Sequence, residues 1–265
     1  ASFDHCFEEQ LMISLKEIDK IYRSSRGDET VALKGISFDV EEGEFITIVG
    51  PSGCGKTTLL KIIGGLIPKT AGKIYLDGSE IAGPNPKIGL IFQSPVLLPW
   101  RTIYENIMLP VDVRKAPRKE HDRWARELLE LVGLTGFENY YPSELSGGMQ
   151  QRAALCRAMI NNPSILLMDE PFGALDAMTR ENMNVWLQRI WLESGKTVVF
   201  VTHSIPEAVF LADRVVVLSS RPGCIDEVIS VDIPRPRSIN VMTTEQFGAH
   251  VQTIRTKFGS EGALD

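Results

Sequence analysis

A glycine-rich segment between an apolar run and a helical pattern constrains this chain most. Residues Gly50–Thr57 read G-P-S-G-C-G-K-T, which fits G-x-x-x-x-G-K-[ST], directly after the apolar run Glu44–Val49. Glycines let backbone N–H groups turn toward phosphate oxygens, and the start of the following helix adds partial positive charge. Lys56 supplies a cation for the β- and γ-phosphates, and the Thr57 hydroxyl can ligate Mg²⁺. The segment therefore predicts a nucleotide phosphate site.

Cys54 lies inside this loop and has a second possible role. A helix N-terminus lowers the pKa of a nearby thiol, which makes Cys54 a candidate redox-sensitive residue. Phosphate binding needs only its backbone, so the residue type alone does not decide between these roles.

Short apolar runs alternate with helical patterns over much of the chain. This alternation predicts an α/β fold with a mainly parallel sheet. Near-alternation of apolar and polar residues in Ile36–Glu41, which follows a first strand at Leu11–Ile18, favours a half-exposed antiparallel piece before the glycine-rich loop. A helix is expected around Thr179–Glu193. The other expected strands are Ile165–Asp169, Thr197–Thr202 and Arg214–Leu218.

Residues 94–142 interrupt the alternation. Prolines punctuate their first half, and Trp124, Leu128 and Leu131 then recur at the i, i+4, i+7 spacing of a helix. We expect a mostly helical subdomain at about 94–160. After about residue 226 we expect a short tail with an extended, proline-stiffened Ile233–Arg237. An amphipathic helix carrying Phe247, Val251, Ile254 and Phe258 on one face follows it.

Composition excludes several classes of protein. The formal net charge of -6 argues against a general nucleic-acid binder, whose domain usually carries a basic stripe. No apolar run has the 18 or so residues needed to cross a bilayer. The four cysteines are scattered without metal-ligand spacing, and the acidic segment 1–10 lacks the apolar region of a signal peptide. We therefore expect a chain with reduced thiols and no signal peptide.

Two carboxylates end one of the buried strands. Asp169 and Glu170 follow the apolar run Ile165–Met168, at the carboxyl edge where ligands of open α/β sheets bind. Asp169 can hold Mg²⁺ directly or through water. Glu170 points differently because side chains alternate along a strand, so it can face an attacking water. His203 follows the next strand and could reach a γ-phosphate, although the residues alone leave an ordinary surface histidine equally open.

A second anion site is expected where another helix begins. Ser146 is a natural N-cap, and Gly147 and Gly148 expose backbone N–H groups at the helix start. One small chain cannot easily bring two remote loops to the same γ-phosphate. A two-chain arrangement resolves this difficulty.

These motifs, in this order, resemble those of ATP-binding cassette (ABC) ATPases. The resemblance covers about residues 11–225, and its motifs are Gly50–Thr57, Gln93, Leu145–Gln150, Asp169-Glu170, Ala174-Leu175-Asp176 and His203. It implies a RecA-like P-loop NTPase core with an antiparallel β-subdomain and a helical subdomain. ATP and Mg²⁺ are the implied cofactors, and hydrolysis of ATP is the implied reaction.

The resemblance also implies roles for individual residues. The implied catalytic residues are Glu170 as general base, His203 at the γ-phosphate, Lys56 and Gln93. Thr57, Gln93 and Asp169 would hold the metal. Ser146, Gly147, Gly148 and Gln150 would contact ATP on a second copy, with Asp176 linking the two copies. The implied nucleotide-binding set is Tyr22, stacked on adenine, with Gly50, Pro51, Ser52, Gly53, Cys54, Gly55, Lys56, Thr57 and Thr58.

Two positions depart from the family pattern. The family usually has Asp after the histidine that corresponds to His203, where this chain has Ser204. Ser204 and Glu207 still predict a capping box for the next helix. Thr57 replaces the commoner Ser but keeps the hydroxyl that the metal needs.

The segments Leu98–Thr102, Asp169–Asp176 and Arg221–Gly223 are similar to those of bacterial importers for nitrate, taurine, aliphatic sulfonates or bicarbonate. This resemblance implies an ATPase bound to two transmembrane permease subunits at the cytoplasmic face of the inner membrane. A separate substrate-binding protein would act indirectly, and no nucleic acid would be bound. The alternatives are a soluble ABC mechanoenzyme acting on DNA or ribosomes, and a non-hydrolysing regulatory subunit. The retained Glu170 argues against the latter.

Overall fold

The computed structural model describes residues 11–258 except 26 and 174. The motif residue Ala174 therefore lies outside the described residues, as do the first ten and last seven positions. Within the described part of the chain, no helix has the length and apolar character needed to cross a membrane.

A six-stranded sheet forms the centre of the molecule, in the order β10-β9-β3-β8-β7-β6. The five strands from β9 to β6 in this order run parallel to one another, whereas β10 is antiparallel to β9. Every residue of β3, β7 and β8 is buried, as expected for strands covered on both faces. The strands are β3 (Phe45–Val49), β6 (Ile88–Ile91), β7 (Ile165–Asp169), β8 (Thr197–Val201), β9 (Arg214–Leu218) and β10 (Ile225–Ser230).

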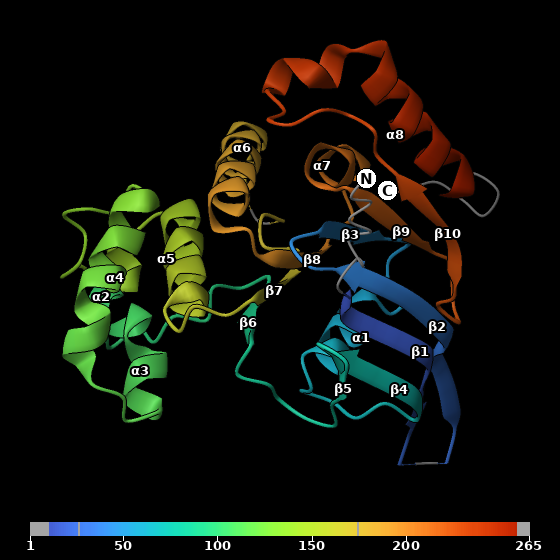
Figure 1. Cartoon of the computed structure of the whole chain (residues 1–265), viewed down its shortest axis with the longest axis horizontal. Helices are drawn as coiled ribbons and strands as arrows, with labels where there is room; N and C mark the ends of the chain where they lie inside the picture. The colour runs from blue at the N-terminus through green and yellow to red at the C-terminus, as the bar shows by residue number, and fades with distance from the viewer. Residues whose placement is uncertain (1–10, 26, 174, 259–265) are drawn as a thin grey trace, which may run out of the picture.

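A second, antiparallel sheet lies beside the first, in the order β2-β1-β4-β5 (Figure 1). Helix α1 (Lys56–Ile63) buries Leu59, Leu60 and Ile63 in a core shared with both sheets. A parallel bridge between Leu33 and Gly223 ties the sheets together near the phosphate loop. The strands are β1 (Leu11–Arg23), β2 (Glu29–Glu41), β4 (Ala71–Leu76) and β5 (Ser79–Glu80).

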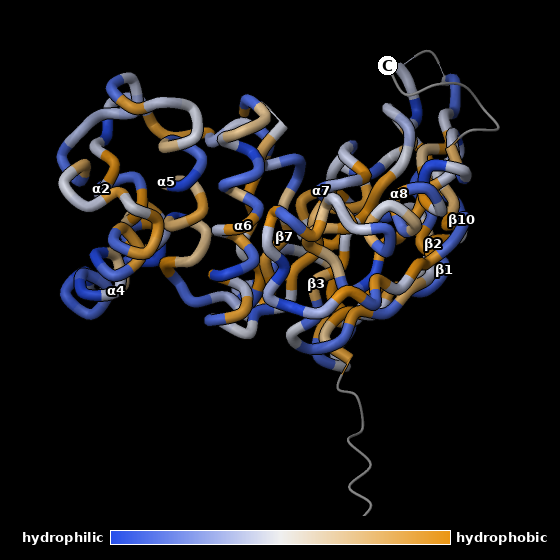
Figure 2. Tube along the Cα trace, turned by 90° about the horizontal axis from the view of Figure 1, so that it is seen from above, coloured by the Kyte–Doolittle hydropathy of each residue, from blue (hydrophilic) through white to orange (hydrophobic). Residues whose placement is uncertain are grey.

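A group of helices extends to one side of the sheets (Figures 1 and 2). Helix α2 begins with a complete capping box between Thr102 and Glu105, and buried Asn106 holds the preceding loop by donating to Leu98, Arg101 and Thr102 carbonyls. The helices are α2 (Ile103–Ile107), α3 (Leu109–Val113), α4 (Arg118–Leu131), the 3-10 turn η1 (Pro142–Glu144) and α5 (Gly147–Met159).

The last third of the chain packs on the large sheet. Helices α6 (Ala177–Ser194) and α7 (Ile205–Leu211) alternate with strands, and α8 (Glu245–Phe258) follows the 3-10 turn η2 (Ile239–Thr243). Phe247, Ile254 and Phe258 of α8 are buried in the main core, with Val251 packed against it. The amphipathic tail helix is thus confirmed.

The expected elements are mostly present, with longer strands at the start. Both strands of the first hairpin extend beyond the expected ranges, to Arg23 and from Glu29, because their ends pair with each other from Ile21 and Val31 to Arg23 and Glu29, a contact that the local pattern does not show. The alternation in Ile36–Glu41 corresponds to alternating burial in β2, which confirms a half-exposed antiparallel strand.

Candidate functional site

An open hollow of about 460 Å³ lies over the phosphate loop, between the two sheets' ends. It collects side chains from β1, β2, the loop after β3, α1 and the end of β7, so residues far apart in sequence meet there. Its lining residues are Tyr22, Thr30, Ala32, Ser52, Gly53, Gly55, Lys56, Thr57, Thr58, Gln93, Glu170 and Arg221.

The phosphate loop is shaped for close approach of backbone N–H groups. Gly55 is the N-cap of α1 with φ of 105°, and a Cβ there would lie 2.7 Å from Leu33 Cδ2 and 3.0 Å from the Ala32 carbonyl oxygen. Only glycine fits this position without strain. Gly50 is similarly close-packed, since a Cβ would lie 2.7 Å from Cys54 Sγ.

Lys56 is a buried cation whose hydrogen-bond partners among the described residues are neutral carbonyl groups. Its side chain is buried, with the residue 6% exposed, and Nζ donates to the carbonyl oxygens of Gly50 at 2.8 Å and Pro51 at 3.1 Å. A buried ammonium without a carboxylate partner favours an incoming anion. This arrangement fits a phosphate group held by the loop.

Thr57 and Asp169 provide the oxygen ligands expected of a Mg²⁺ site. Thr57 Oγ1 donates to Asp169 Oδ1 at 2.9 Å, which joins the start of α1 to the end of β7. Burial raises the pKa of the Asp169 carboxyl, and the neighbouring Glu170 charge raises it further. A cation bound there would relieve both effects. Gln93 lines the same hollow, so the residues fit Mg²⁺ held partly by substrate phosphates.

Glu170 and His203 meet at the carboxyl edge of the sheet. Glu170 has φ of 44°, an unusual value for a residue other than glycine, and its N–H donates to the Val201 carbonyl at 2.9 Å. His203 Nδ1 lies 3.2 Å from Glu170 Oε2. The Glu170 side chain is 20% exposed and the His203 side chain 53%. The unusual backbone conformation of Glu170 therefore places its partly buried carboxylate next to the exposed imidazole of His203.

The second anion motif is placed elsewhere. Ser146 Oγ caps α5 by accepting from the Met149 N–H at 3.3 Å, as expected. Gln150 Nε2 donates to the carbonyls of Pro142 and Leu145, and Asp176 caps α6 through the Thr179 N–H. None of the described residues in 146–150, nor Asp176, lines the hollow at the phosphate loop. The chain therefore does not close its own site with this motif.

The sequence interpretation missed one residue at the phosphate loop and was wrong about half of one capping box. Arg221 Nε donates to the Gly53 carbonyl at 2.8 Å, and its place just beyond β9, at the same sheet edge, was the available signal. Burial raises the pKa of the Cys54 thiol, which favours the backbone role of this residue over the redox alternative. Ser204 caps α7 as expected by accepting from the Glu207 N–H, but the reciprocal bond of a capping box is missing, because the Glu207 carboxyl accepts from Thr202 instead of the Ser204 N–H.

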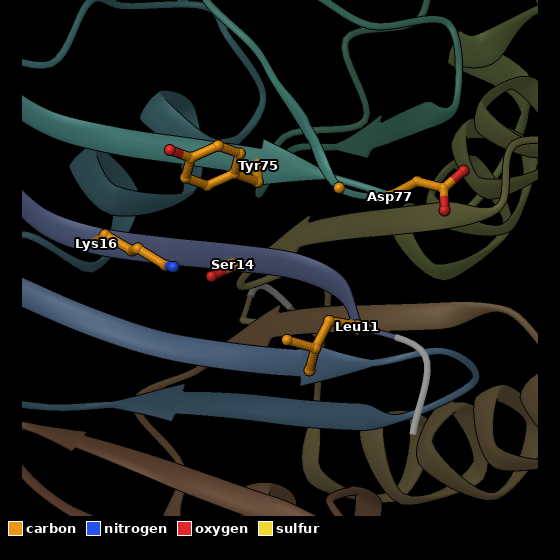
Figure 3. Close-up of a pocket in the computed structure, with 6 residues that line it drawn as sticks. Leu11, Ser14, Lys16, Tyr75 and Asp77 are labelled. Atoms are coloured by element: carbon orange, nitrogen blue, oxygen red, sulfur yellow. The ribbon is translucent and has the colours of Figure 1, made fainter. Parts of the chain in front are cut away.

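A second hollow of about 600 Å³ lies on the outer face of the small sheet (Figure 3). Its lining includes Lys16, whose Nζ lies 5.5 Å from the centre of the Tyr75 ring, and it shares no lining residue with the first hollow. No residue that the sequence singled out lies there.

Comparison with known proteins places this geometry in a family. The sequence profile described as ABC transporter matches residues 33–173. An uncharacterized ABC transporter ATP-binding protein of Methanocaldococcus jannaschii is 48% identical over 228 residues, which cover 86% of this chain and 85% of that protein. The aliphatic sulfonates import ATP-binding protein SsuB of Bacillus licheniformis is 48% identical over 86% of each chain. The bicarbonate transport ATP-binding protein CmpC of Synechococcus elongatus is 46% identical over 86% of this chain and 35% of that longer protein.

Solved structures agree with this placement. The dimeric structure of a bacterial ABC transporter cassette superposes with a TM-score of 0.74 at 37% identity, covering 84% of this chain and 100% of that one. A dimeric post-hydrolysis state of that cassette, bound to ADP and Pi, gives a TM-score of 0.73. The predicted fold class is confirmed, and the chain belongs to the ABC transporter family as an ATP-hydrolysing cassette.

Proposed function

We propose that the chain is the ATPase subunit of an ABC importer, and that its hydrolysis site is completed by a second copy of itself. The observation that carries the proposal is the convergence of Lys56, the Thr57–Asp169 pair and the Glu170–His203 pair at one sheet edge. The named relatives SsuB and CmpC support uptake of a small anion, of the sulfonate or bicarbonate class. These names also favour transport over the alternative of a DNA- or ribosome-acting machine.

The contacts of the described side chains support the following steps of hydrolysis. Lys56 exchanges its two loop carbonyls for β- and γ-phosphate oxygens of ATP, while Tyr22, exposed beside Thr58, offers its ring to adenine. Mg²⁺, held by Thr57, Asp169 and Gln93, would supply neutralisation of phosphate charge. Glu170 accepts a proton from a water whose oxygen attacks the γ-phosphorus, and the bond to the ADP oxygen breaks in line.

His203 contributes to the same step through its position. Its Nδ1 contacts Glu170, which leaves Nε2 for a γ-phosphate oxygen. This pairing fixes the imidazole relative to the carboxylate that receives the proton. Loss of either side chain would therefore impair turnover more than ATP binding.

A head-to-tail pair of chains would supply the missing part of each site. Ser146, Gly147, Gly148 and Gln150 at the start of α5 lie outside the hollow. Ser146 and Gly147 are exposed there and would be the first to meet the ATP of a partner chain. Asp176 would link the two copies. The dimeric arrangement of the related cassette supports this proposal. ATP would hold the dimer closed, and hydrolysis would release it.

The same proposal divides the chain into parts. Residues 11–225 would form the ABC ATPase domain, with the helical subdomain inserted at about 94–160, and 226–265 would form the tail. The helices α2–α5 gathered on one side of the sheets support this division (Figure 1).

The segment after Gln93 supports a permease partner at the membrane. Trp100 is 71% exposed and Val96 57%, and the two lie on a turn that Arg157 holds by donating to the Pro95 and Val96 carbonyls at 2.7 Å each. Exposed apolar side chains on a fixed turn suit a short helix from a membrane-spanning subunit. The chain would then lie at the cytoplasmic face of the membrane, and a substrate-binding protein would act only indirectly.

Co-purification tests this part of the proposal. The tagged chain, captured from detergent-solubilised native membranes, should retain a multi-span permease that mass spectrometry identifies. Trp100→Ala and Leu98→Asp should weaken that retention while ATP binding stays unchanged. Val113, equally exposed at 73% but on α3, provides the control Val113→Ala. Equal recovery of the permease with all four chains would contradict the docking surface, and recovery of only soluble partners would contradict the transport assignment.

A further inference from the structure

A carboxyl group is buried directly behind the loop that carries His203. Glu207, on α7, is only 5% exposed, and its Oε1 has no hydrogen-bond partner among the described residues. Burial raises the pKa of this carboxyl. Burying a carboxyl with one oxygen unpaired costs free energy, so its presence calls for an explanation. The proposed hydrolysis steps give Glu207 no role.

The other Glu207 oxygen is connected to the residues on either side of His203 through one hydroxyl. Thr202, which is also buried, donates its Oγ1–H to Glu207 Oε2 and accepts the Ser204 N–H at 3.0 Å on the same oxygen. Thr202 and Ser204 are the two neighbours of His203. The backbone on both sides of the histidine is therefore fixed by a hydroxyl whose orientation depends on Glu207.

The carboxyl also lies against helix α6. Asn184 is buried beside Glu207, and its Oδ1 has no partner among the described atoms. One turn earlier, Arg180 donates to the carbonyls of Phe172 at 3.3 Å and Leu175 at 2.9 Å, in the loop that follows Glu170. Glu207 thus lies between the His203 loop and the helix that holds the Glu170 loop.

Helix capping does not explain the carboxyl. Ser204 Oγ already accepts from the Glu207 N–H and caps α7, with Pro206 in its first turn. An apolar side chain at position 207 would fill the same space without burying a polar group. What the carboxyl adds over an apolar side chain is its hydrogen bond with the Thr202 hydroxyl, beside its contact with Asn184.

We propose that Glu207 is a positioning residue for ATP hydrolysis, which holds His203 against Glu170 through the hydroxyl of Thr202. This inference rests on the proposed function of the site. If Glu207 has this role, its substitution should lower kcat and leave the affinity for ATP nearly unchanged. ATP binding depends on the phosphate loop, which Glu207 does not contact, whereas turnover depends on the placement of His203.

The test is steady-state phosphate release with Mg-ATP by the purified chain, together with equilibrium ATP binding. Glu207→Ala and Thr202→Val should each lower kcat by about tenfold to 100-fold, with ATP affinity within about twofold of the parent. The double variant should lose little more than either single one, because both break the same link. Glu207→Gln and Thr202→Ser keep the link and should recover most of the lost turnover.

A matched control separates positioning from stability. Gln188 is buried one turn along α6 from Asn184, and within residues 11–258, where described, its side chain binds the Arg237 backbone alone. Gln188→Ala should therefore lower the melting temperature without lowering kcat of the folded protein. Multiplied losses in the double variant, or unchanged kcat in both single variants, would overturn the inference while the ATPase assignment stands. An inactive parent chain would overturn both.

Discussion

Substitution of Glu170 by Gln tests the chemistry of the site with little change in shape. Gln has nearly the same volume, and its amide can keep the contact with His203 Nδ1 that Glu170 Oε2 makes at 3.2 Å. The main change is loss of the oxygen that accepts the proton from water. Lys56, Thr57 and Asp169 are untouched, so the phosphate and metal contacts remain.

The size of the effect follows from the surroundings of the carboxylate. General-base catalysis contributes about 10²–10⁴-fold, or about 3–5 kcal/mol of barrier. The Glu170 side chain is only 20% exposed, so bulk water can replace the base poorly. We expect the upper half of that range, a fall in kcat of about 10³-fold or more. ATP affinity should stay equal or rise, because one negative charge near the phosphates is removed.

Two measurements check this prediction. Phosphate release at saturating Mg-ATP gives kcat, and equilibrium titration gives the affinity for ATP. Size-exclusion chromatography with ATP should show more dimer for Glu170→Gln than for the parent, since the ATP-bound state persists. A variant that keeps more than about a tenth of parental kcat would refute Glu170 as the general base. Weakened ATP binding would refute the separation of binding from chemistry.

Three further predictions concern stability and reactivity. Arg118 holds the pKa of the Asp112 carboxyl below its usual range. The ion pair therefore stabilises the folded chain above about pH 4, and this stabilisation is lost as the pH falls through the folded-state pKa. Asp112→Asn should lower the free energy of unfolding in urea by about 1 kcal/mol near neutral pH and by less in acid. Equal costs at both pH values would contradict this. The buried guanidinium of Arg237 donates to carbonyls at the end of α7, so Arg237→Met should lower the free energy of unfolding in urea by about 3 kcal/mol. A decrease of less than about 1 kcal/mol would contradict this role of Arg237. Burial raises the pKa of Cys54, so alkylation mapped by mass spectrometry should be at least about tenfold slower in the folded chain than in urea, and equal rates would contradict the buried thiol.

Local patterns were sufficient where one short segment carries both the element and its chemistry. The phosphate loop, the strand ending in Asp169 and the cap at Ser146 follow from spacing, apolar runs and residue type, and the structure has them where expected. The same holds for α8, whose apolar face repeats with helical period.

Contacts between distant segments were beyond the sequence patterns. Arg221 reaches Gly53 across 168 positions, and Arg237 binds carbonyls of α7 from within a segment that reads only as proline-stiffened. Ser204 and Glu207 have the spacing of a capping box, but the Glu207 carboxyl accepts from the Thr202 hydroxyl, which is buried beside it, and not from the Ser204 N–H. Such choices depend on tertiary packing, which single-segment patterns do not encode.

In the proposed dimer, each hydrolysis site combines the phosphate loop of one chain with the α5 start of another. Lys56→Ala disables the loop and Ser146→Arg disables the helix start, so each variant alone should be inactive in phosphate release. In an equal mixture, half of the dimers pair the two variants, and each mixed dimer has one intact site. The mixture should therefore recover about one quarter of parental activity. A mixture as inactive as either variant alone would contradict the two-chain site.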